Sequence, residues 1–311
     1  MIIDLWDSWS GKFSSDMKKH WEELGHEVRF NGLKYDPEIP ADIAFWYQAD
    51  NASQVGILKS NAKKKFVQCV DIEVYAGQPF AVDWTKVDGC MFMAKHIRDY
   101  VLSKQQFPQN VRLLLTKPGV DIDKWTLNKS PKSTPVKKIA YVVGDHRIWD
   151  VKRLDTAFQL LYDLNRAGQP WIYQLHIRGT YSSHVQYNTY CQYLEKDLGL
   201  EGFVVWYPDR VGDMNGWLND KDYFLLPSTK EAFSYATAEA MCKGIKPIIN
   251  NWEGSKDTWG GFVSNSYGEM MQHFLEDKYE PEKYRQYIID NYDIKRYMKE
   301  VDEFLEIGGD E

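Results

Sequence analysis

The most informative segment of the chain covers residues 223–254 and reads YFLLPSTKEAFSYATAEAMCKGIKPIINNWEG. Its first apolar run, Tyr223–Leu226, predicts a buried strand that ends at a Pro-Ser pair. A helix over 234–243 follows and is closed by Gly244, and a second apolar run, Pro247–Ile249, predicts the next strand. The segment is therefore a β-α-β unit whose helix begins just beyond the carboxyl end of a strand.

The start of this helix is suited to binding an anion. Free backbone N–H groups at a helix N-terminus carry partial positive charge, and open α/β sheets bind ligands beyond the carboxyl ends of their strands. Glu231 precedes the helix and Glu239 lies within it. A carboxylate repels phosphate, so Glu231 suits sugar hydroxyls beyond the phosphate, and Glu239 suits ribose hydroxyls. The alternative for both glutamates is a solvated charge at a helix end.

The same alternation of strands and helices extends to both sides of this segment. Further strands are predicted at Ile2–Leu5, Glu27–Phe30, Asp42–Trp46, Phe66–Val70, Gly89–Met93, Val111–Leu115, Lys138–Val143, Ile172–Ile177 and Phe203–Trp206. Near-continuous apolar strands separated by helices indicate doubly wound parallel sheets. We expect two Rossmann-like α/β domains, over 1–123 and 138–290, joined by a Pro-containing linker at 124–137. A C-terminal helix in 291–311 is expected to pack back on the first domain.

Two of the intervening helices have clear sequence signals. One carries an apolar stripe at Met17, Trp21 and Leu24, with Ser14 or Ser15 as its cap and Gly25 after its end. The other, predicted over 150–166, carries Leu154, Ala157, Phe158, Leu161 and Leu164 on one face, with Gly168 after its end. A third helix is predicted from Lys95 to Ser103.

Composition excludes several classes of protein. The 311 residues carry 38 basic and 45 acidic side chains, and a net charge of −7 argues against bulk nucleic acid as the main partner. Four scattered cysteines without a CxxC pair fit a reduced cytoplasm better than a disulfide framework or a zinc site. Asp4 interrupts the first apolar run, so we expect no signal peptide, and no transmembrane segment is expected either. GxGxxG and P-loop patterns are absent, so the common dinucleotide and P-loop sites are not indicated. The histidines never fall into a HExxH or HxH spacing, so no metal is expected.

Residues 227–247 resemble the signature of retaining GT-B glycosyltransferases of family 4, roughly P-S-x-x-E-G-F-G-x-x-x-x-E-A-M-A-x-G-x-P-V. The matching positions are Pro227, Ser228, Glu231, Phe233, Glu239, Ala240, Met241, Gly244 and Pro247. Ala232 and Ser234 replace two glycines and make the loop stiffer. The resemblance implies that Glu231 contacts the donor sugar and that Glu239 contacts the ribose. It also implies that the loop amides around Phe233, Ser234 and Tyr235 receive the diphosphate.

Weaker similarities follow in the order that the family has them. Gly11 lies in a turn after the first strand, where the family has a glycine-rich turn at the donor. Arg147 and Lys152 resemble the basic pair that stabilises the leaving diphosphate, although two extra residues precede Arg147. The alternatives are a tight turn for Gly11 and surface charges for Arg147 and Lys152. Asp121-Ile-Asp123 has a DxD form that could hold a cation, or it is a solvated acidic pair.

Asp71 marks a departure from the family pattern. Many members carry a His in a V-H-D context after the corresponding strand, whereas this chain reads Cys69-Val70-Asp71-Ile72-Glu73. Asp71 therefore takes the place of the His. Two interpretations stay open: Asp71 accepts a hydroxyl proton from the acceptor, or it caps the following helix.

The resemblance implies a metal-independent, retaining hexosyltransferase with no cofactor. It would move a sugar from a nucleotide-diphosphate donor, with a UDP-sugar favoured, to a glycan, lipid-linked or other acceptor. A nucleotide-sugar epimerase, a phosphorylase and a non-catalytic nucleotide-sugar-binding protein share the fold and remain alternatives. A DNA-modifying glycosyltransferase is a further alternative, because basic runs occur at Lys59–Lys65 and Lys129–Lys138 despite the acidic balance.

Overall fold

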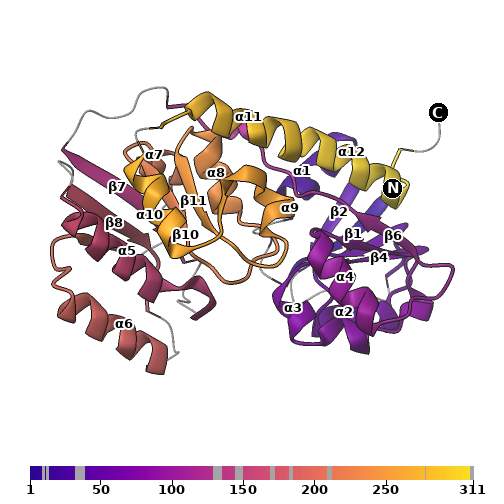
Figure 1. The fold of residues 1–311 in the computed structure, drawn as a ribbon. Helices are drawn as coiled ribbons and strands as arrows, with labels where there is room; N and C mark the ends of the chain where they lie inside the picture. The colour runs from indigo at the N-terminus through magenta and orange to yellow at the C-terminus, as the bar shows by residue number, and fades with distance from the viewer. Residues whose placement is uncertain are drawn as a thin grey trace. The chain divides into compact units, whose positions relative to one another are not determined.

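The computed structural model describes residues 1–8, 11, 14–31, 39–128, 135–143, 150–168, 172–181, 185–208, 212–276 and 278–308. The chain divides into two units, of which unit 1 comprises Met1–Gly119 and Ile294–Glu311 and unit 2 comprises Val120–Asp293. Each unit contains one six-stranded sheet with helices packed on it (Figure 1). All pairings between neighbouring strands are parallel. The predicted fold class, two doubly wound parallel α/β domains, is confirmed.

The sheet of unit 1 has the strand order β2-β1-β3-β4-β5-β6. Its strands are β1 (Ile2–Trp6), β2 (Glu27–Asn31), β3 (Ile43–Trp46), β4 (Lys64–Cys69), β5 (Gly89–Phe92) and β6 (Arg112–Leu115). The direction in which the chain adds strands reverses between β1 and β3. In open α/β sheets this reversal opens a crevice beyond the carboxyl ends of the two strands.

The helices of unit 1 are α1 (Ser15–Glu23), α2 (Asn51–Lys59), α3 (Ile72–Tyr75), α4 (Lys95–Lys104) and α12 (Ile294–Leu305), with 3₁₀ turns at Gln78–Ala81 and Trp84–Lys86. One apolar cluster joins the sheet to α1 and α12, although α12 comes from the far end of the chain. Its members include Phe45 and Phe66 from the sheet, Trp21 from α1, and Val301 and Leu305 from α12.

The sheet of unit 2 has the order β12-β11-β10-β7-β8-β9. Its strands are β7 (Val136–Val142), β8 (Ile172–Arg178), β9 (Val204–Tyr207), β10 (Tyr223–Leu226), β11 (Lys246–Asn250) and β12 (Val263–Ser264). Strand addition reverses between β7 and β10. The segment quoted at the outset supplies β10 and β11, so it forms one side of this reversal.

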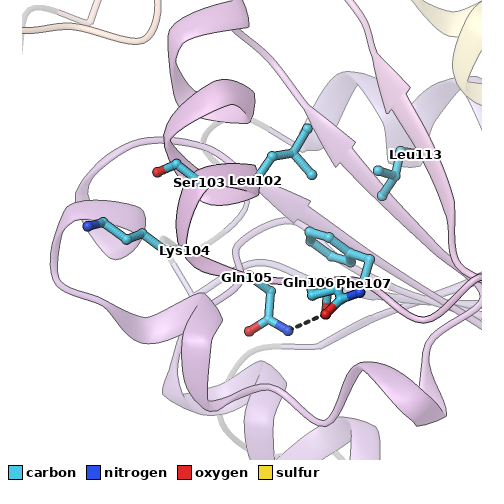
Figure 2. A pocket seen from close by; sticks show the side chains of 7 residues that line it. All are labelled: Leu102, Ser103, Lys104, Gln105, Gln106, Phe107 and Leu113. Carbon is cyan, nitrogen blue, oxygen red and sulfur yellow. Dashed lines mark hydrogen bonds between the residues drawn. The ribbon is translucent and has the colours of Figure 1, made fainter.

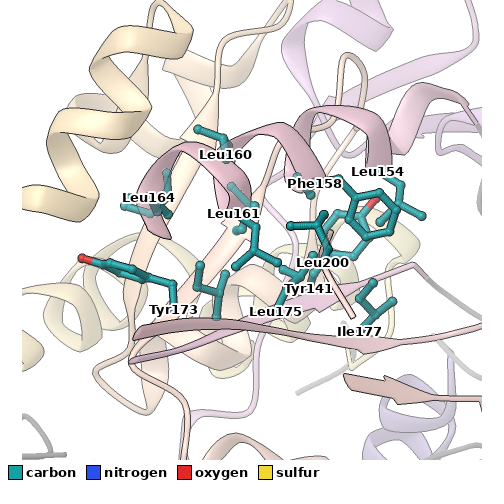
Figure 3. Packing of buried hydrophobic residues seen from close by; sticks show 14 of the residues in the cluster. Tyr141, Leu154, Phe158, Leu160, Leu161, Leu164, Tyr173, Leu175, Ile177 and Leu200 are labelled. Atoms are coloured by element: carbon teal, nitrogen blue, oxygen red, sulfur yellow. The ribbon is translucent and has the colours of Figure 1, made fainter. Parts of the chain in front are cut away.

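Helices cover both faces of the unit 2 sheet. They are α5 (Leu154–Arg166), α6 (Val185–Asp197), α7 (Met214–Leu218), α8 (Tyr235–Cys242), α9 (Ser255–Trp259), α10 (Tyr267–Leu275) and α11 (Pro281–Tyr292), with 3₁₀ turns at Ile122–Lys124, Asp150–Lys152 and Gly260–Phe262. One core contains residues of α5, α6 and α10, and Figure 3 shows Leu154, Phe158 and Leu161 of α5 lying over the strands. A second core joins the sheet to α7, α8 and α11. Within the described ranges, no helix is both long and apolar enough to cross a bilayer.

Three local predictions need correction. Ser14 occupies the N-cap position of α1, but its hydroxyl donates to Asp7 instead of capping the helix. Leu24 lies just after α1 and is exposed, so the buried stripe consists of Met17 and Trp21 alone. The helix predicted from residue 150 begins at Leu154, because Arg153 adopts a left-handed conformation, with φ of 53°, after a 3₁₀ turn.

Candidate functional site

Lys152 and Glu231 meet at the strand reversal of unit 2. The chain leaves β10 at Leu226 and reaches Glu231 within one loop, and Lys152 ends the 3₁₀ turn that follows β7. The Lys152 ammonium forms an ion pair with Oε1 of Glu231. Both residues were predicted from the sequence, and the structure brings them together where open α/β sheets bind their ligands.

The carboxylate of Glu231 is largely buried but keeps one oxygen open. The residue is 8% exposed, and the Ser228 hydroxyl donates to Oε1 at 2.8 Å. Oε1 therefore accepts from both Ser228 and Lys152. Oε2 has no hydrogen-bond partner among the described residues, and it is not sealed from solvent. The geometry presents one carboxylate oxygen to a ligand while the other oxygen is fixed by the protein.

Lys152 is held through its backbone. The buried Tyr141 hydroxyl donates to the carbonyl of Lys152 at 2.8 Å, and burial raises the pKa of Tyr141 well above its usual range. The amide of Thr229 donates to the carbonyl of Val151 at 2.9 Å and ties this turn to the loop after β10. The half-buried ammonium is thus fixed relative to Glu231 and is free of other acidic partners among the described residues.

The N-terminus of α8 lies three residues after Glu231. Ser234 is its N-cap, and the Ser234 hydroxyl accepts from the Thr237 amide at 3.4 Å. The amides of Phe233, Ser234 and Ala236 have no acceptor within the described part of the chain. Unpaired amides at a helix start, next to a lysine, form a site suited to a phosphate group.

An aromatic cluster supports the loop that carries these amides. The Phe233 ring stacks on Trp259, with ring centres 5.2 Å apart, and packs against Tyr292 at 4.9 Å. Gly244, which closes α8, has φ of 76°, and an added Cβ would lie 2.6 Å from Pro281. The glycine in the sequence signature is therefore required by both conformation and packing.

The remaining predicted residues of this site are Tyr235, Glu239 and Arg147. Tyr235 begins α8 and its ring packs edge-on against Phe233. Glu239 lies one turn further along α8 and is half-buried. Arg147 lies outside the described residues.

Gly11 belongs to unit 1 and its local geometry is restrictive. It has φ of 78°, and a Cβ at this position would lie 2.7 Å from the Phe30 ring. Its carbonyl accepts from the Ser15 amide at the start of α1. These contacts account for a glycine here by backbone geometry alone.

Asp71 lies after the carboxyl end of β4, also in unit 1. It occupies the N-cap position of α3, but its side chain accepts no capping hydrogen bond. Glu73, in the first turn of α3, folds back instead, and its carboxylate accepts from the amides of Val70 and Asp71, which precede the helix. Burial raises the pKa of Glu73, and the nearby Asp71 charge adds to this effect. The interpretation in which the Asp71 side chain caps α3 is therefore wrong.

Sequence reasoning missed a polar cluster at the strand reversal of unit 1. Asp7, which is 1% exposed, accepts from Ser14 at 2.8 Å and from Gln48 at 3.2 Å. Ser8 donates to Asp50, the N-cap of α2. The available signal was a pair of polar runs directly after two apolar strands, because parallel strands end at the same sheet edge.

Sequence reasoning also assigned no role to Trp252. Its indole N–H donates to the backbone carbonyl of Glu231 at 3.0 Å, from the turn after β11. The only sequence signal was a tryptophan in the short Asn-Asn-Trp-Glu-Gly run that follows the strand.

The hollow drawn in Figure 2 lies away from these residues, in unit 1. It has a volume of about 510 Å³ and lies between the end of α4 and β6, with Leu102, Phe107 and Leu113 among its lining residues. Gln105 donates to the carbonyl of Gln106 at its rim. The lining offers neither a pair of opposite charges nor a helix N-terminus, so it is not part of the candidate site.

No protein-family model matches this chain, and no curated protein matches its sequence. Solved structures do match. A glycosyltransferase from Rickettsia africae aligns with 98% of this chain and 97% of its own, at 14% identity and a TM-score of 0.71. Sucrose-phosphate synthase from Thermosynechococcus elongatus aligns over 98% of both chains, at 12% identity and a TM-score of 0.73. Anabaena HepE, solved with UDP and glucose, aligns with 98% of this chain and 99% of its own, at 13% identity and a TM-score of 0.71. The resemblance stated from the sequence is thereby confirmed for the architecture: the chain has the GT-B fold of these glycosyltransferases.

Proposed function

We propose that the protein is a glycosyltransferase that transfers a sugar from a UDP-sugar to an acceptor with retention of anomeric configuration. The observation that carries this proposal is the Lys152–Glu231 ion pair beside the N-terminus of α8, at the strand reversal of unit 2. The structural similarity to HepE, which was solved with UDP and glucose, supports a uridine nucleotide.

Each group of the site suits one part of such a donor. The amides of Phe233, Ser234 and Ala236 suit the diphosphate, and Lys152 adds a positive charge next to them. Oε2 of Glu231 suits a sugar hydroxyl, and Glu239 suits the ribose. Arg147 is proposed as a second cation on the diphosphate.

The chemical step needs stabilisation of the leaving diphosphate. As the glycosidic bond breaks, negative charge grows on the phosphate oxygen that leaves. The amides at the start of α8 and the Lys152 ammonium would stabilise this charge, and one such donor is commonly worth about 10²–10³ in rate. In this proposal the Lys152 ammonium turns from Oε1 of Glu231 to the diphosphate when the donor binds, while Oε1 stays bonded to Ser228 and Oε2 meets the sugar. We place the acceptor at unit 1, with Asp71 as the group that takes its proton.

The test begins with a thermal-shift screen against UDP-, GDP-, ADP- and TDP-sugars. A ligand at 100 times its Kd raises the unfolding free energy by about 2.7 kcal/mol, so the preferred nucleotide is resolved clearly. The preferred donor is then incubated with protein and candidate glycan, lipid-linked and DNA acceptors. A glycosylated acceptor supports the proposal. An isomerised sugar instead indicates an epimerase, and binding without any turnover indicates a non-catalytic protein.

A further inference from the structure

The turn after β11 is hydrogen-bonded to the loop that carries Glu231. The Asn250 amide group donates to the carbonyl of Ser228 at 3.1 Å, and the Trp252 indole donates to the carbonyl of Glu231 at 3.0 Å. The two bonds hold the loop at both ends of the stretch between Ser228 and Glu231. The position of the Glu231 backbone is therefore set by residues about twenty positions further along the chain.

Trp252 is itself anchored. Its amide donates to the Ser255 hydroxyl at 3.1 Å, and its carbonyl accepts from the Ser255 amide at 2.9 Å. The Ser255 hydroxyl also contacts the Asn251 side chain at 3.0 Å. Ser255 is fully buried and Trp252 is 7% exposed, so the indole is locked in one orientation.

We propose that Trp252 is a positioning residue that acts through Glu231 and aims its free carboxylate oxygen at the sugar of the donor. This inference rests on the proposed function. With the backbone held by Trp252 and Oε1 held by Ser228, Glu231 has one oxygen left, Oε2, in a fixed direction. Because this carboxylate oxygen is already fixed as a hydrogen-bond acceptor, little conformational entropy is lost when the sugar of the donor binds to it.

The inference predicts a selective effect on the sugar part of the donor. The probes are UDP alone and the UDP-sugar that wild type binds most tightly among UDP-glucose, UDP-galactose and UDP-N-acetylglucosamine, both measured by calorimetry. Trp252→Phe keeps an aromatic ring but removes the N–H donor. It should weaken UDP-sugar binding by about fivefold to tenfold, the equivalent of one hydrogen bond, and change UDP binding less than about twofold.

A double-mutant cycle with Glu231→Gln tests whether the effect passes through Glu231. Trp252→Phe added to Glu231→Gln should cause no further loss of UDP-sugar affinity. Trp217→Phe is the matched control, because the Trp217 indole N–H is buried in the same unit without a partner among the described residues. The control should leave the ratio of the two affinities unchanged. If Trp252→Phe melts too early to measure, Ser255→Ala loosens the same anchor and should give the same pattern.

The possible results separate the two proposals. Equal weakening of UDP and UDP-sugar by Trp252→Phe, or an undiminished effect of it in the Glu231→Gln background, overturns the positioning role and leaves the proposed function intact. A Glu231→Gln variant with unchanged affinity likewise overturns the inference alone, and failure of wild type to bind any UDP-sugar overturns the proposed function and the inference together.

Discussion

Glu231 concentrates the chemistry of the candidate site in one side chain. Its two oxygens have separate surroundings, since Oε1 meets Ser228 and Lys152 and Oε2 is open. We expect Glu231→Gln to lower sugar transfer by at least about 100-fold, because the single amide oxygen stays with Ser228 and an uncharged NH₂ group, a donor, then replaces Oε2 at the sugar hydroxyl. The melting temperature should fall only slightly, since Gln still accepts from Ser228. Turnover and thermal unfolding of the same preparation check this, and wild-type turnover would refute the role.

Asp71 makes a second prediction at the residue scale. Its side chain does not cap α3, whereas Glu73 holds the backbone just before α3 through the amides of Val70 and Asp71. Asp71→Asn should therefore leave the melting temperature nearly unchanged and, if Asp71 takes the acceptor proton, lower the transfer rate by about 10² or more. Glu73→Ala is the contrasting variant, and it should lower stability by about 1 kcal/mol through loss of the hydrogen bonds to the Val70 and Asp71 amides. An active Asp71→Asn enzyme would mean that another group accepts the proton.

His176 gives stability a pH dependence. It lies on β8, where burial, with a smaller effect from Lys221, lowers its pKa from 6.5 to about 4. The folded state therefore binds fewer protons than the unfolded state between pH 4 and 6.5. The contribution of His176 to the free energy of unfolding is fully present above about pH 6.5. It is lost as the pH falls toward 4, by up to about 3 kcal/mol. The free energy of unfolding, measured in urea at pH 7 and at pH 5, should differ less between the two pH values for His176→Gln than for wild type. An equal difference in the two proteins would refute this role of His176.

The site was only partly predictable from single residues. Glu231 could be named from the strand end and the helix start around it, whereas Lys152 was named from its resemblance to the family's basic pair. Trp252 could not, since its role depends on a hydrogen bond to the carbonyl of Glu231, a residue distant in sequence that only the folded chain brings near. A tryptophan in a loop has no spacing that reveals such a partner.

Secondary elements were predictable where apolar runs were short and bounded. Tyr223–Leu226 was predicted with its observed bounds, since Pro227 follows it and a polar pair, Lys221 and Asp222, precedes it. The helix start after Lys152 was misplaced, because the sequence does not show that Arg153 takes a left-handed conformation. Strand order and the partners of each helix depend on contacts that are distant in sequence, and no period in the sequence encodes them.

At the scale of the element, Ser234 connects the stability of α8 to the donor loop. Its φ of −103° needs no glycine, and its hydroxyl accepts from Thr237. Ser234→Ala should lower the unfolding free energy by about 0.5–2 kcal/mol, and Ser234→Gly by only a few tenths, because glycine is itself a tolerated N-cap. If urea unfolding shows that the two variants lose the same unfolding free energy, the Ser234 hydroxyl does not stabilise the helix. Ser234→Gly also restores the family residue, so its donor affinity should not fall below that of wild type.

At the scale of the whole molecule, the last helix completes the first domain. The core of unit 1 takes Tyr297, Met298, Val301, Phe304 and Leu305 from α12, all of them buried. Arg112 of β6 donates to the carbonyl of Phe304 at 2.7 Å, which fixes the end of the helix to the sheet. The chain therefore closes unit 1 only after unit 2 has been made.

Removal of α12 should consequently unfold unit 1 and spare unit 2. Each of its five buried apolar side chains contributes about 1.5–3 kcal/mol, and their sum, about 10 kcal/mol, is as large as the whole stability of a typical domain. A chain that ends at Asp293 should lose one calorimetric transition and keep the transition of unit 2, with residues 1–119 digested first by protease. A chain that ends at Gly308 is the control and should keep both transitions, because it retains every buried residue of α12. Should the shorter chain also keep both, the sheet with α1 alone would be sufficient to hold the core of unit 1, and the contribution assigned to α12 would be wrong.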